Sequence, residues 1–205
     1  MEDSISEILV KSECYVNSNK TNDTMIKTAN GDKVIAYLSC RLAISNVEVR
    51  KKIEDGLIEQ IQKRFTNDVT IVGMATAGIP WAHAVAEKLE LPLLYLRSSE
   101  KEYGLKGLIE GNMKFATKKA IIIDDVLYTG NTVKKAQKVL TENGIKTVGV
   151  ACIASLRDST CEELIKQQIK VVKLTDYRKL ITSALNNKVL NENEYNFMKK
   201  IYEEK

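Results

Sequence analysis

The chain has 205 residues, of which 44% are hydrophobic and 28% are charged, and its formal net charge is +4. This length suits one α/β domain with a substantial buried core. The mild charge, without a dense block of Lys and Arg, argues against nucleic-acid binding. The first residues, MEDSISEILVKSECY, lack the basic and apolar regions of a signal peptide, and no apolar run approaches the ~20 residues of a membrane span.

Cysteine usage points to a cytoplasmic protein. Cys14, Cys40, Cys152 and Cys161 are widely scattered, and none forms a CxxC pair. With one histidine in the chain, a zinc site is not expected. We therefore expect free, buried thiols, as in a reducing compartment.

Apolar spacing predicts helices and strands that alternate along the chain. Val49, Ile53, Leu57, Ile61 and Phe65 recur every four residues, which is typical of an amphipathic helix. The helices expected, in chain order, are 3–14, 47–65, 80–89, 131–143, 159–168, 175–185 and one that begins near 191. The strands expected are 34–39, 69–75, 91–97, 119–125, 146–154 and 170–174.

Local signals mark several element ends. Pro80 suits the first position of a helix. Ser159 with Glu162 forms a capping box, and Asn191 with Glu194 caps the last helix. The polar, glycine-containing segment 98–111 is expected to be a loop flanked by short strands.

The alternation predicts a parallel sheet that is covered by helices on both faces. In such sheets ligands bind at the carboxyl ends of the strands. Segments 75–78, 97–104 and 124–132 should emerge there.

The segment IIIDDVLYTGNTV, residues 121–133, is typical of a phosphate site. An apolar strand delivers a hydroxyl-rich turn to a helix N-terminus, where N–H groups and the helix dipole favour an anion. Thr129 and Thr132 add hydroxyl donors, and Gly130 permits close backbone approach. The motif is not a Walker A loop, because Lys134 does not follow a GxxxxG frame.

Asp124 and Asp125 precede this turn. Carboxylates beside a phosphate would repel it unless they accept hydrogen bonds from sugar hydroxyls or hold Mg²⁺ through water. The whole segment therefore suits a ribose 5-phosphate. The alternative is a capped helix with two acidic residues at its N-terminus, which would contribute about 1 kcal/mol.

Four segments carry a family resemblance. AIIIDDVLYTGNTV resembles the phosphoribosyl diphosphate (PRPP) binding motif of type I phosphoribosyltransferases. YLRSSEKEYGLKGLIEG (95–111) resembles the mobile catalytic loop of orotate phosphoribosyltransferases, and GMATAGIPWAHAVAEKLELP (73–92) resembles their diphosphate loop and the following helix. NGDKVIAYLSCRLAISNVEVRKKI (30–53) resembles their N-terminal strand and helix.

The resemblance implies the type I phosphoribosyltransferase fold, an α/β fold with a central, mostly parallel sheet flanked by helices and a small N-terminal hood. It implies one domain over 1–205, with a base-binding hood at about 1–45, a core at about 46–205 and a mobile loop at about 98–109. The implied reaction joins PRPP to orotate and gives orotidine 5′-monophosphate and diphosphate, with Mg²⁺ held by Asp124 and Asp125 through water and substrate. The implied assembly is a homodimer in which each loop reaches the neighbouring site, with no nucleic-acid or membrane partner.

The resemblance also assigns residues to roles. Catalysis falls to Lys101, Arg97 and Asp125. The base would meet Tyr128, Arg157 or Lys27. The expected PRPP contacts are Arg97, Lys101, Tyr103, Asp124, Asp125, Val126, Leu127, Tyr128, Thr129, Gly130, Asn131, Thr132, Thr76, Ala77 and Gly78. Trp81 and His83, on the helix after the diphosphate loop, are expected to have packing or surface roles.

Four positions depart from the family pattern: Ala77, Ser98, Tyr103 and Tyr128. Tyr128 is the most consequential, because a small hydroxyl residue usually lines the base pocket there. The spelling DDVLYTG also occurs in uracil phosphoribosyltransferase regulators of pyrimidine operons. The alternatives are therefore a transferase for uracil or another base, or a PRPP-binding regulator without turnover.

Overall fold

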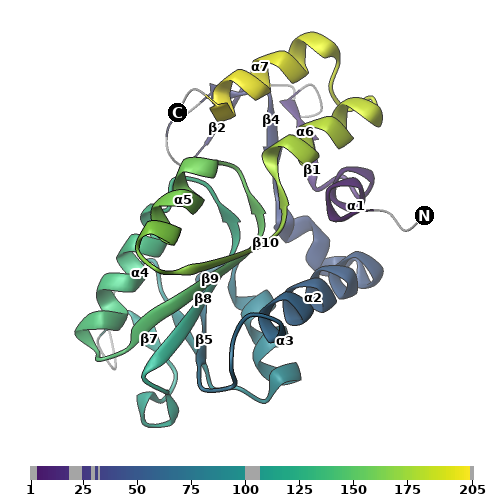
Figure 1. Cartoon of the computed structure of the whole chain (residues 1–205). Helices are drawn as coiled ribbons and strands as arrows, with labels where there is room; N and C mark the ends of the chain where they lie inside the picture. The colour runs from purple at the N-terminus through teal and green to yellow at the C-terminus, as the bar shows by residue number, and fades with distance from the viewer. Residues whose placement is uncertain (1–3, 19–24, 29–30, 32, 100–106, 204–205) are drawn as a thin grey trace. The chain divides into compact units, whose positions relative to one another are not determined.

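The computed structural model describes residues 4–18, 25–28, 31, 33–99 and 107–203 (Figure 1). The chain divides into two compact units. One comprises Glu54–Leu174, and the other comprises Met1–Ile53 together with Thr175–Lys205. The expectation of a single domain stays a prediction.

A six-stranded sheet forms the centre of the first unit, in the order β10-β9-β8-β5-β6-β7. β5 pairs in parallel with β6 and β8, β8 pairs in parallel with β9, and only the short β7 is shown to run antiparallel to its neighbour, β6. The strands are β5 (Thr70–Met74), β6 (Leu93–Leu96), β7 (Ile109–Glu110), β8 (Lys119–Leu127), β9 (Lys146–Ser155) and β10 (Lys170–Asp176). The predicted mostly parallel sheet is confirmed.

Helices cover both faces of this sheet (Figure 1). α3 (Ile79–Leu89) packs on β5 and β8, and α4 (Asn131–Glu142) packs on β9. Alternate strand residues serve the two faces: Ile122 belongs to the core that contains Leu140 of α4 and Leu164 of α5 (Asp158–Lys166). On the α3 face, a Cβ at Gly73 would lie 2.9 Å from the methyl of Ala82. Because β5 and β8 are covered on both faces of the sheet, their sequences contain continuous apolar runs.

The second unit joins both ends of the chain. α1 (Ile5–Lys11) packs on α6 (Tyr177–Asn186), which packs on α7 (Glu192–Glu203). The amide of Asn17 donates to the carbonyl of Val189 at 2.9 Å. The strands of this second unit form two antiparallel pairs: β1 (Tyr15–Asn17) with β4 (Ala36–Leu38), and β2 (Ile26–Lys27) with β3 (Lys33–Val34). The 3-10 helix η2 (Cys40–Ser45) follows β4 in the chain. α2 (Val47–Gln62) crosses from this unit into the first.

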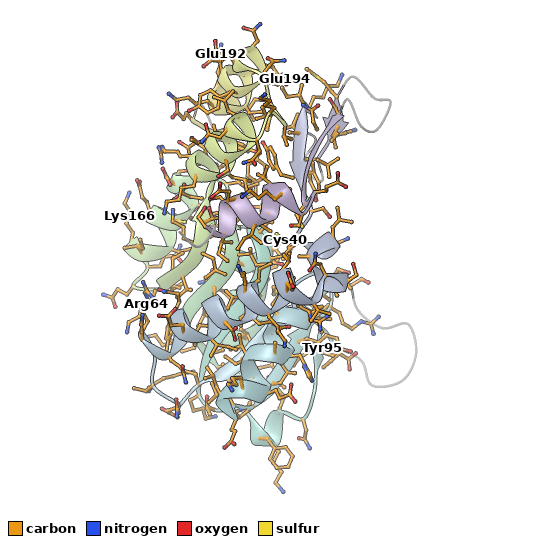
Figure 2. The ribbon with its side chains drawn as sticks, turned by 90° about the vertical axis from the view of Figure 1, so that its right-hand side faces the viewer. Cys40, Arg64, Tyr95, Lys166, Glu192 and Glu194 are labelled. Carbon is orange, nitrogen blue, oxygen red and sulfur yellow. The ribbon has the colours of Figure 1, made fainter. Side chains whose placement is uncertain are left out.

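The helix-end predictions had mixed outcomes. Asn191 and Glu194 cap α7 as expected: Asn191 N–H donates to the Glu194 carboxylate at 2.8 Å, and Glu194 N–H donates to Asn191 Oδ1 at 3.0 Å (Glu194 is labelled in Figure 2). The Ser159 capping box is wrong, because α5 already begins at Asp158 and Ser159 lies inside its first turn. Pro80 lies in the first turn of α3, as predicted.

Other predictions concern side chains. All four cysteines are free and buried. Trp81 is fully buried, while His83 lies on the surface of α3, 3.9 Å from the Glu87 carboxylate. Among the described residues, no helix combines the length and apolar character needed to cross a membrane.

Candidate active site

Three connecting segments emerge at one edge of the sheet, because β5, β6 and β8 are parallel. The segments follow Met74, Leu96 and Leu127. Ala75 N–H donates to the carbonyl of Leu96 at 2.8 Å, which ties the first segment to the second. The strand order thus brings together the predicted diphosphate turn, the ends of the 98–109 loop and the predicted phosphate turn.

The phosphate turn spans Tyr128–Gly130 and leads into α4. Gly130 adopts a left-handed conformation (φ +73°), and the helix N-terminus has no side-chain cap at that position. Asn131 and Thr132 are exposed, while Thr129 is half-buried. A glycine with positive φ lets the chain turn sharply into α4, and the uncapped first turn presents backbone N–H groups with the positive end of the helix dipole.

Asp124 and Asp125 are half-buried at the end of β8. Each carboxylate accepts a hydrogen bond from the next backbone N–H: Asp125 N–H to Asp124 Oδ1 and Val126 N–H to Asp125 Oδ1, both at 2.9 Å. These bonds orient the two carboxylates without neutralising them. The sequence motif thus places two carboxylates directly before the phosphate turn.

These carboxylates fit Mg²⁺, whose preferred ligands are oxygens and which usually keeps several waters. No group of three or more His, Cys, Asp or Glu side chains suited to a metal occurs in the described part of the chain. Two carboxylates therefore match a cation that takes its other ligands from substrate and water. The Mg²⁺ assignment stays a prediction.

A buried thiol lies beside Asp124. Cys152 pairs with Asp124 in the β8–β9 register and is completely buried. Burial raises the pKa of Cys152 strongly, and the nearby Cys161 thiol and Asp124 carboxylate raise it further. The thiol therefore stays neutral, and the negative charge at this point of the sheet belongs to the aspartates.

The diphosphate turn, residues 75–78, lies directly against β8. Thr76 is exposed, whereas Ala77 and Gly78 are buried. The Ala75–Thr76 peptide is cis, and Gly78 N–H donates to the Met74 carbonyl at 2.9 Å. A Cβ at Gly78 would lie 2.3 Å from the carbonyl oxygen of Ile123, so only glycine fits between the turn and the strand. The predicted residues Thr76, Ala77 and Gly78 therefore line the edge next to β8.

The ends of the 98–109 loop are closed by β6 and β7. Arg97 N–H donates to the Leu108 carbonyl at 2.9 Å, and Arg97 Nη1 lies 3.5 Å from Glu110 Oε1. Arg97 is thus held at the base of the loop, beside the site edge. Lys101 and Tyr103 lie outside the described residues, and their roles stay predictions.

Arg157 and Tyr128 are in direct contact. Arg157 Nη2 donates to the Tyr128 hydroxyl at 2.8 Å, and the guanidinium carbon lies 4.1 Å from the ring centre. The Thr160 hydroxyl donates to the Tyr128 carbonyl at 2.6 Å. Arg157 therefore lies beside the phosphate turn, and its contact with the base stays a prediction. Lys27 is exposed on β2 in the other compact unit, and its predicted contact with the base stays a prediction.

Two residues of this edge escaped sequence analysis. Glu110 pairs with Arg97, and Thr160 holds the phosphate turn. Glu110 lies in the GLIEG end of the 95–111 segment, but nothing in that segment singles it out as the partner of Arg97. In the sequence, Thr160 is one of several polar residues near the expected start of a helix. Only the strand pairing and the packing of α5 reveal them.

Comparisons with known proteins agree with this geometry. The sequence model of the phosphoribosyl transferase domain matches residues 34–183. The orotate phosphoribosyltransferase of Streptococcus agalactiae is 36% identical over 86% of this chain and 84% of its own, and that of Listeria monocytogenes is 37% identical over 77% and 76%. The chain belongs to the phosphoribosyl transferase domain family and, within it, to the orotate phosphoribosyltransferases.

Solved structures support the same fold. The orotate phosphoribosyltransferase of Aeropyrum pernix superposes with a TM-score of 0.75 at 22% identity, over 91% of this chain and 99% of its own. The UMP synthase of Leishmania donovani gives 0.79 at 20% identity, over 98% of this chain and 42% of its own. The predicted type I phosphoribosyltransferase fold is confirmed.

Proposed function

We propose that this chain transfers the 5-phosphoribosyl group of PRPP to orotate in UMP synthesis. The products are orotidine 5′-monophosphate and diphosphate. The observation that carries the proposal is the meeting of two turns at one sheet edge: the uncapped N-terminus of α4, preceded by two carboxylates, and the glycine-dependent turn 75–78. The similarity to orotate phosphoribosyltransferases supports the choice of base.

The phosphate turn binds the 5-phosphate of PRPP. The first N–H groups of α4 and the hydroxyls of Thr129 and Thr132 donate to the phosphate oxygens, with the helix dipole adding to the attraction. Asp124 and Asp125 accept hydrogen bonds from the ribose hydroxyls. Asp124 and Asp125 would hold Mg²⁺ through water and substrate, and the bound ion would supply positive charge against the diphosphate.

In the reaction, the C1′–oxygen bond to diphosphate breaks and its electron pair leaves with the diphosphate. A ring nitrogen of orotate forms the new bond to C1′ and releases its proton to diphosphate or solvent. The ribose passes through an oxocarbenium-like state while negative charge grows on the diphosphate. N–H groups of the 75–78 turn, the Arg97 guanidinium and the Lys101 ammonium stabilise that charge. Positioning of the two reactants supplies much of the remaining rate enhancement.

The orotate carboxylate needs a cationic partner, because it loses water on binding. Arg157 offers a planar guanidinium that the Tyr128 ring and hydroxyl hold in one orientation. Lys27 is the second candidate.

We further propose a cytoplasmic homodimer in which loop 98–109 of one subunit reaches the site of its neighbour. Its four free, buried cysteines suit a reducing compartment. Arg97 and Leu108, at the two ends of the loop, lie at the site edge, which supports a loop that covers a bound ligand. Closure would keep water from the activated ribose.

Orotate absorbance provides the test of the proposed reaction. Purified protein should consume orotate only when PRPP and Mg²⁺ are both present. Uracil, hypoxanthine and adenine are assayed alongside under the same conditions. Preference for uracil would favour the uracil phosphoribosyltransferase reading that Tyr128 suggests, and PRPP binding without turnover of any base would favour a regulator.

A further inference from the structure

Thr160 makes two contacts with the phosphate turn from outside it. Its hydroxyl donates to the carbonyl of Tyr128 at 2.6 Å. Its methyl carbon lies 2.9 Å from the place where a Cβ on Gly130 would be. Thr160 is itself buried, with 6% of its surface exposed. One side chain therefore bonds to Tyr128 at the start of the turn and fills the space that a side chain at position 130 would need.

The first contact continues the hydrogen bonding of β8 beyond its last residue. The carbonyl of Leu127 accepts from Leu156 N–H at 2.8 Å, and the carbonyl of Gly130 accepts from Lys134 N–H at 2.9 Å, inside α4. Between these backbone bonds, the carbonyl of Tyr128 takes its hydrogen bond from the Thr160 side chain. Because Gly130 is flexible and the N-terminus of α4 has no side-chain cap, this bond and the backbone bonds on either side hold the turn.

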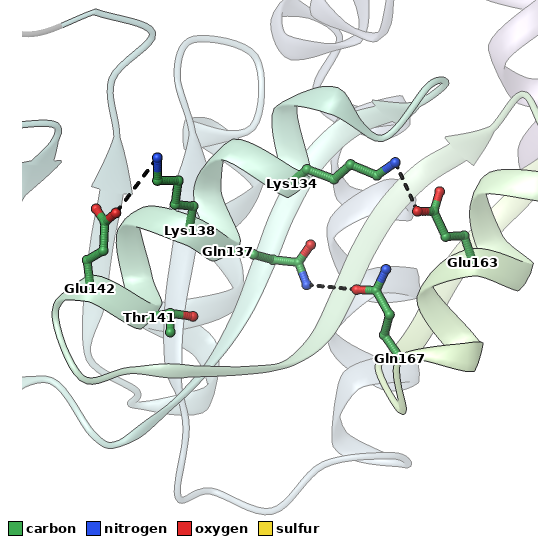
Figure 3. A pocket seen from close by; sticks show the side chains of 7 residues that line it. All are labelled: Lys134, Gln137, Lys138, Thr141, Glu142, Glu163 and Gln167. Carbon is green, nitrogen blue, oxygen red and sulfur yellow. Dashed lines mark hydrogen bonds and ion pairs between the residues drawn. The ribbon is translucent and has the colours of Figure 1, made fainter.

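α5, which carries Thr160, is linked to α4 along its length. Lys134 Nζ of α4 lies 2.9 Å from Glu163 Oε1 of α5, and the Gln137 amide donates to Gln167 Oε1 at 3.4 Å (Figure 3). Figure 3 shows these side chains reaching across the groove between the two helices. Leu140 of α4 and Leu164 of α5 share one apolar core. Thr160 is therefore carried by a helix with a defined position beside the turn.

We propose that Thr160 is a positioning residue for PRPP binding, which keeps the N–H groups of the phosphate turn directed at the 5-phosphate. This inference deepens the proposed function and rests on its phosphate site. Loss of the hydroxyl removes the hydrogen bond from Thr160 to the Tyr128 carbonyl, and the turn relaxes in the free protein. Ligand binding must then restore the turn, so affinity falls while the chemical step, which occurs after the turn is restored, changes little.

Thr160→Val tests this role, because it removes the hydroxyl and keeps the shape. We expect the dissociation constant of ribose 5-phosphate, measured by calorimetry, and the KM of PRPP to rise about tenfold, with kcat within about threefold of the wild-type value. Thr160→Ser, which restores the hydroxyl, should return both constants close to wild type. Thr160→Ala replaces the valine variant if that protein does not fold.

Thr147→Val is the matched control. Thr147 is also a buried threonine, on β9, and its hydroxyl has no hydrogen-bond partner among the described residues. The same substitution there should leave both constants unchanged. The positioning role is overturned if Thr160→Val binds ribose 5-phosphate as tightly as the wild type does. It is also overturned if Thr147→Val loses as much affinity for ribose 5-phosphate as Thr160→Val.

Ribose 5-phosphate binding separates this proposal from the proposed reaction, because it needs no base. A wild-type protein that binds ribose 5-phosphate but does not consume orotate contradicts the orotate reaction, and the Thr160 comparison still applies. A wild-type protein that binds neither ribose 5-phosphate nor PRPP overturns the phosphate site and the role of Thr160 together.

Discussion

The guanidinium of Arg157 lies over the ring of Tyr128, 4.1 Å from its centre, and donates to the hydroxyl of the same residue at 2.8 Å. Tyr128 stands where the family pattern has a small hydroxyl residue, and the contact gives the large side chain a function. The ring supports the cation by a cation–π interaction, and the hydroxyl sets its rotation. We therefore expect Tyr128 and Arg157 to act on a ligand as one unit.

Base selectivity should follow from this unit. We expect kcat/KM for orotate to exceed that for uracil by at least about a hundredfold, because uracil offers no carboxylate to the half-buried Arg157 guanidinium. Tyr128→Phe keeps the ring but removes the hydroxyl that orients Arg157, so orotate kcat/KM should fall about tenfold while uracil turnover changes little. Steady-state kinetics with both bases provide the measurement.

Replacing Arg157 with Lys tests the role of its guanidinium, and Arg178 supplies the control. Its guanidinium lies 4.5 Å from the ring centre of Tyr177 in the other compact unit. Arg157→Lys should lower orotate kcat/KM more than Tyr128→Phe does, because an ammonium lacks the planar fork. Arg178→Lys should have no such effect. If Arg157→Lys affects orotate and uracil equally, Arg157 does not read the carboxylate.

The paired carboxylates of β8 should be essential for turnover. Replacing Asp124 and Asp125 together with Asn keeps an acceptor oxygen for the Asp125 and Val126 N–H groups, so the fold should survive. The charge that we propose holds Mg²⁺ and the ribose hydroxyls is lost, so orotate consumption should stop. Circular dichroism checks the fold, and Asp68→Asn, at an exposed aspartate paired with Lys119, is the control. An active double variant would remove the ribose assignment.

Lys101 should act on the leaving diphosphate. Lys101→Ala should lower kcat by about a hundredfold or more, since the contact forms mainly in the transition state, with a much smaller change in PRPP affinity. Lys138→Ala, at an exposed lysine of α4 beside Glu142, should leave kcat unchanged. Single-turnover kinetics separate the chemical step from product release.

Hybrid dimers test whether Lys101 acts across subunits. Mixing Lys101→Ala with Asp125→Asn protein creates dimers that contain one site with both native residues, provided that the loop comes from the neighbour. Part of the activity should then return. Inactive mixtures, after exchange of tagged subunits has been verified, would mean that the loop serves its own chain.

Gly78 should be indispensable to the diphosphate turn. In Gly78→Ala the new Cβ would lie 2.3 Å from the Ile123 carbonyl oxygen and 2.9 Å from backbone atoms of Met74. Backbone cannot yield as a side chain can, so the free energy of unfolding should fall by about 3 kcal/mol. Urea denaturation measures the loss. In Gly56→Ala the Cβ meets only the end of the Leu174 side chain, at 3.2 Å, so that control should change stability by less than about 1 kcal/mol.

Cys152 should make stability depend on alkaline pH. Its pKa is raised by burial, so the folded protein keeps a proton that the unfolded chain releases near its ordinary pKa of about 8.5. The unfolded state then binds fewer protons, and stability falls as pH rises above about 8.5, by up to ~1.4 kcal/mol per pH unit. Cys14 and Tyr15, whose pKa values burial also raises, contribute in the same direction.

The contribution of Cys152 appears in the slope of stability against pH. Urea unfolding is measured for the wild type and for Cys152→Ala between about pH 7.5 and 10, a range that spans the ordinary thiol pKa. The slope of the free energy of unfolding against pH is then compared between the two proteins. The alanine variant should lose less stability across this range, whatever its stability at neutral pH. Parallel curves of stability against pH for the two proteins would show that the Cys152 thiol has the same pKa in the folded and unfolded states.

The short strands β1 and β2 were not predicted, but the sequence alone was sufficient for the alternation of the longer strands and helices and for the motif 121–133. Those features depend on neighbours: apolar residues repeat at the period of a helix or strand, and Gly130 and the hydroxyls of the turn sit within a few positions of Asp124. The carboxyl-end location of the site followed from strand alternation, because parallel strands end at one edge.

Only the tertiary structure revealed the contacts that support the site. Thr160 meets Tyr128 across 32 residues of chain, and the Asn17 amide reaches Val189 across 172. No periodicity links such positions, because each partner is set by how α5 packs beside α4 or how the two chain ends pack together. The cap predicted at Ser159 was misplaced because α5 begins at Asp158. Its cap position holds Arg157, whose guanidinium has no acceptor for helix N–H groups and donates to the Tyr128 hydroxyl.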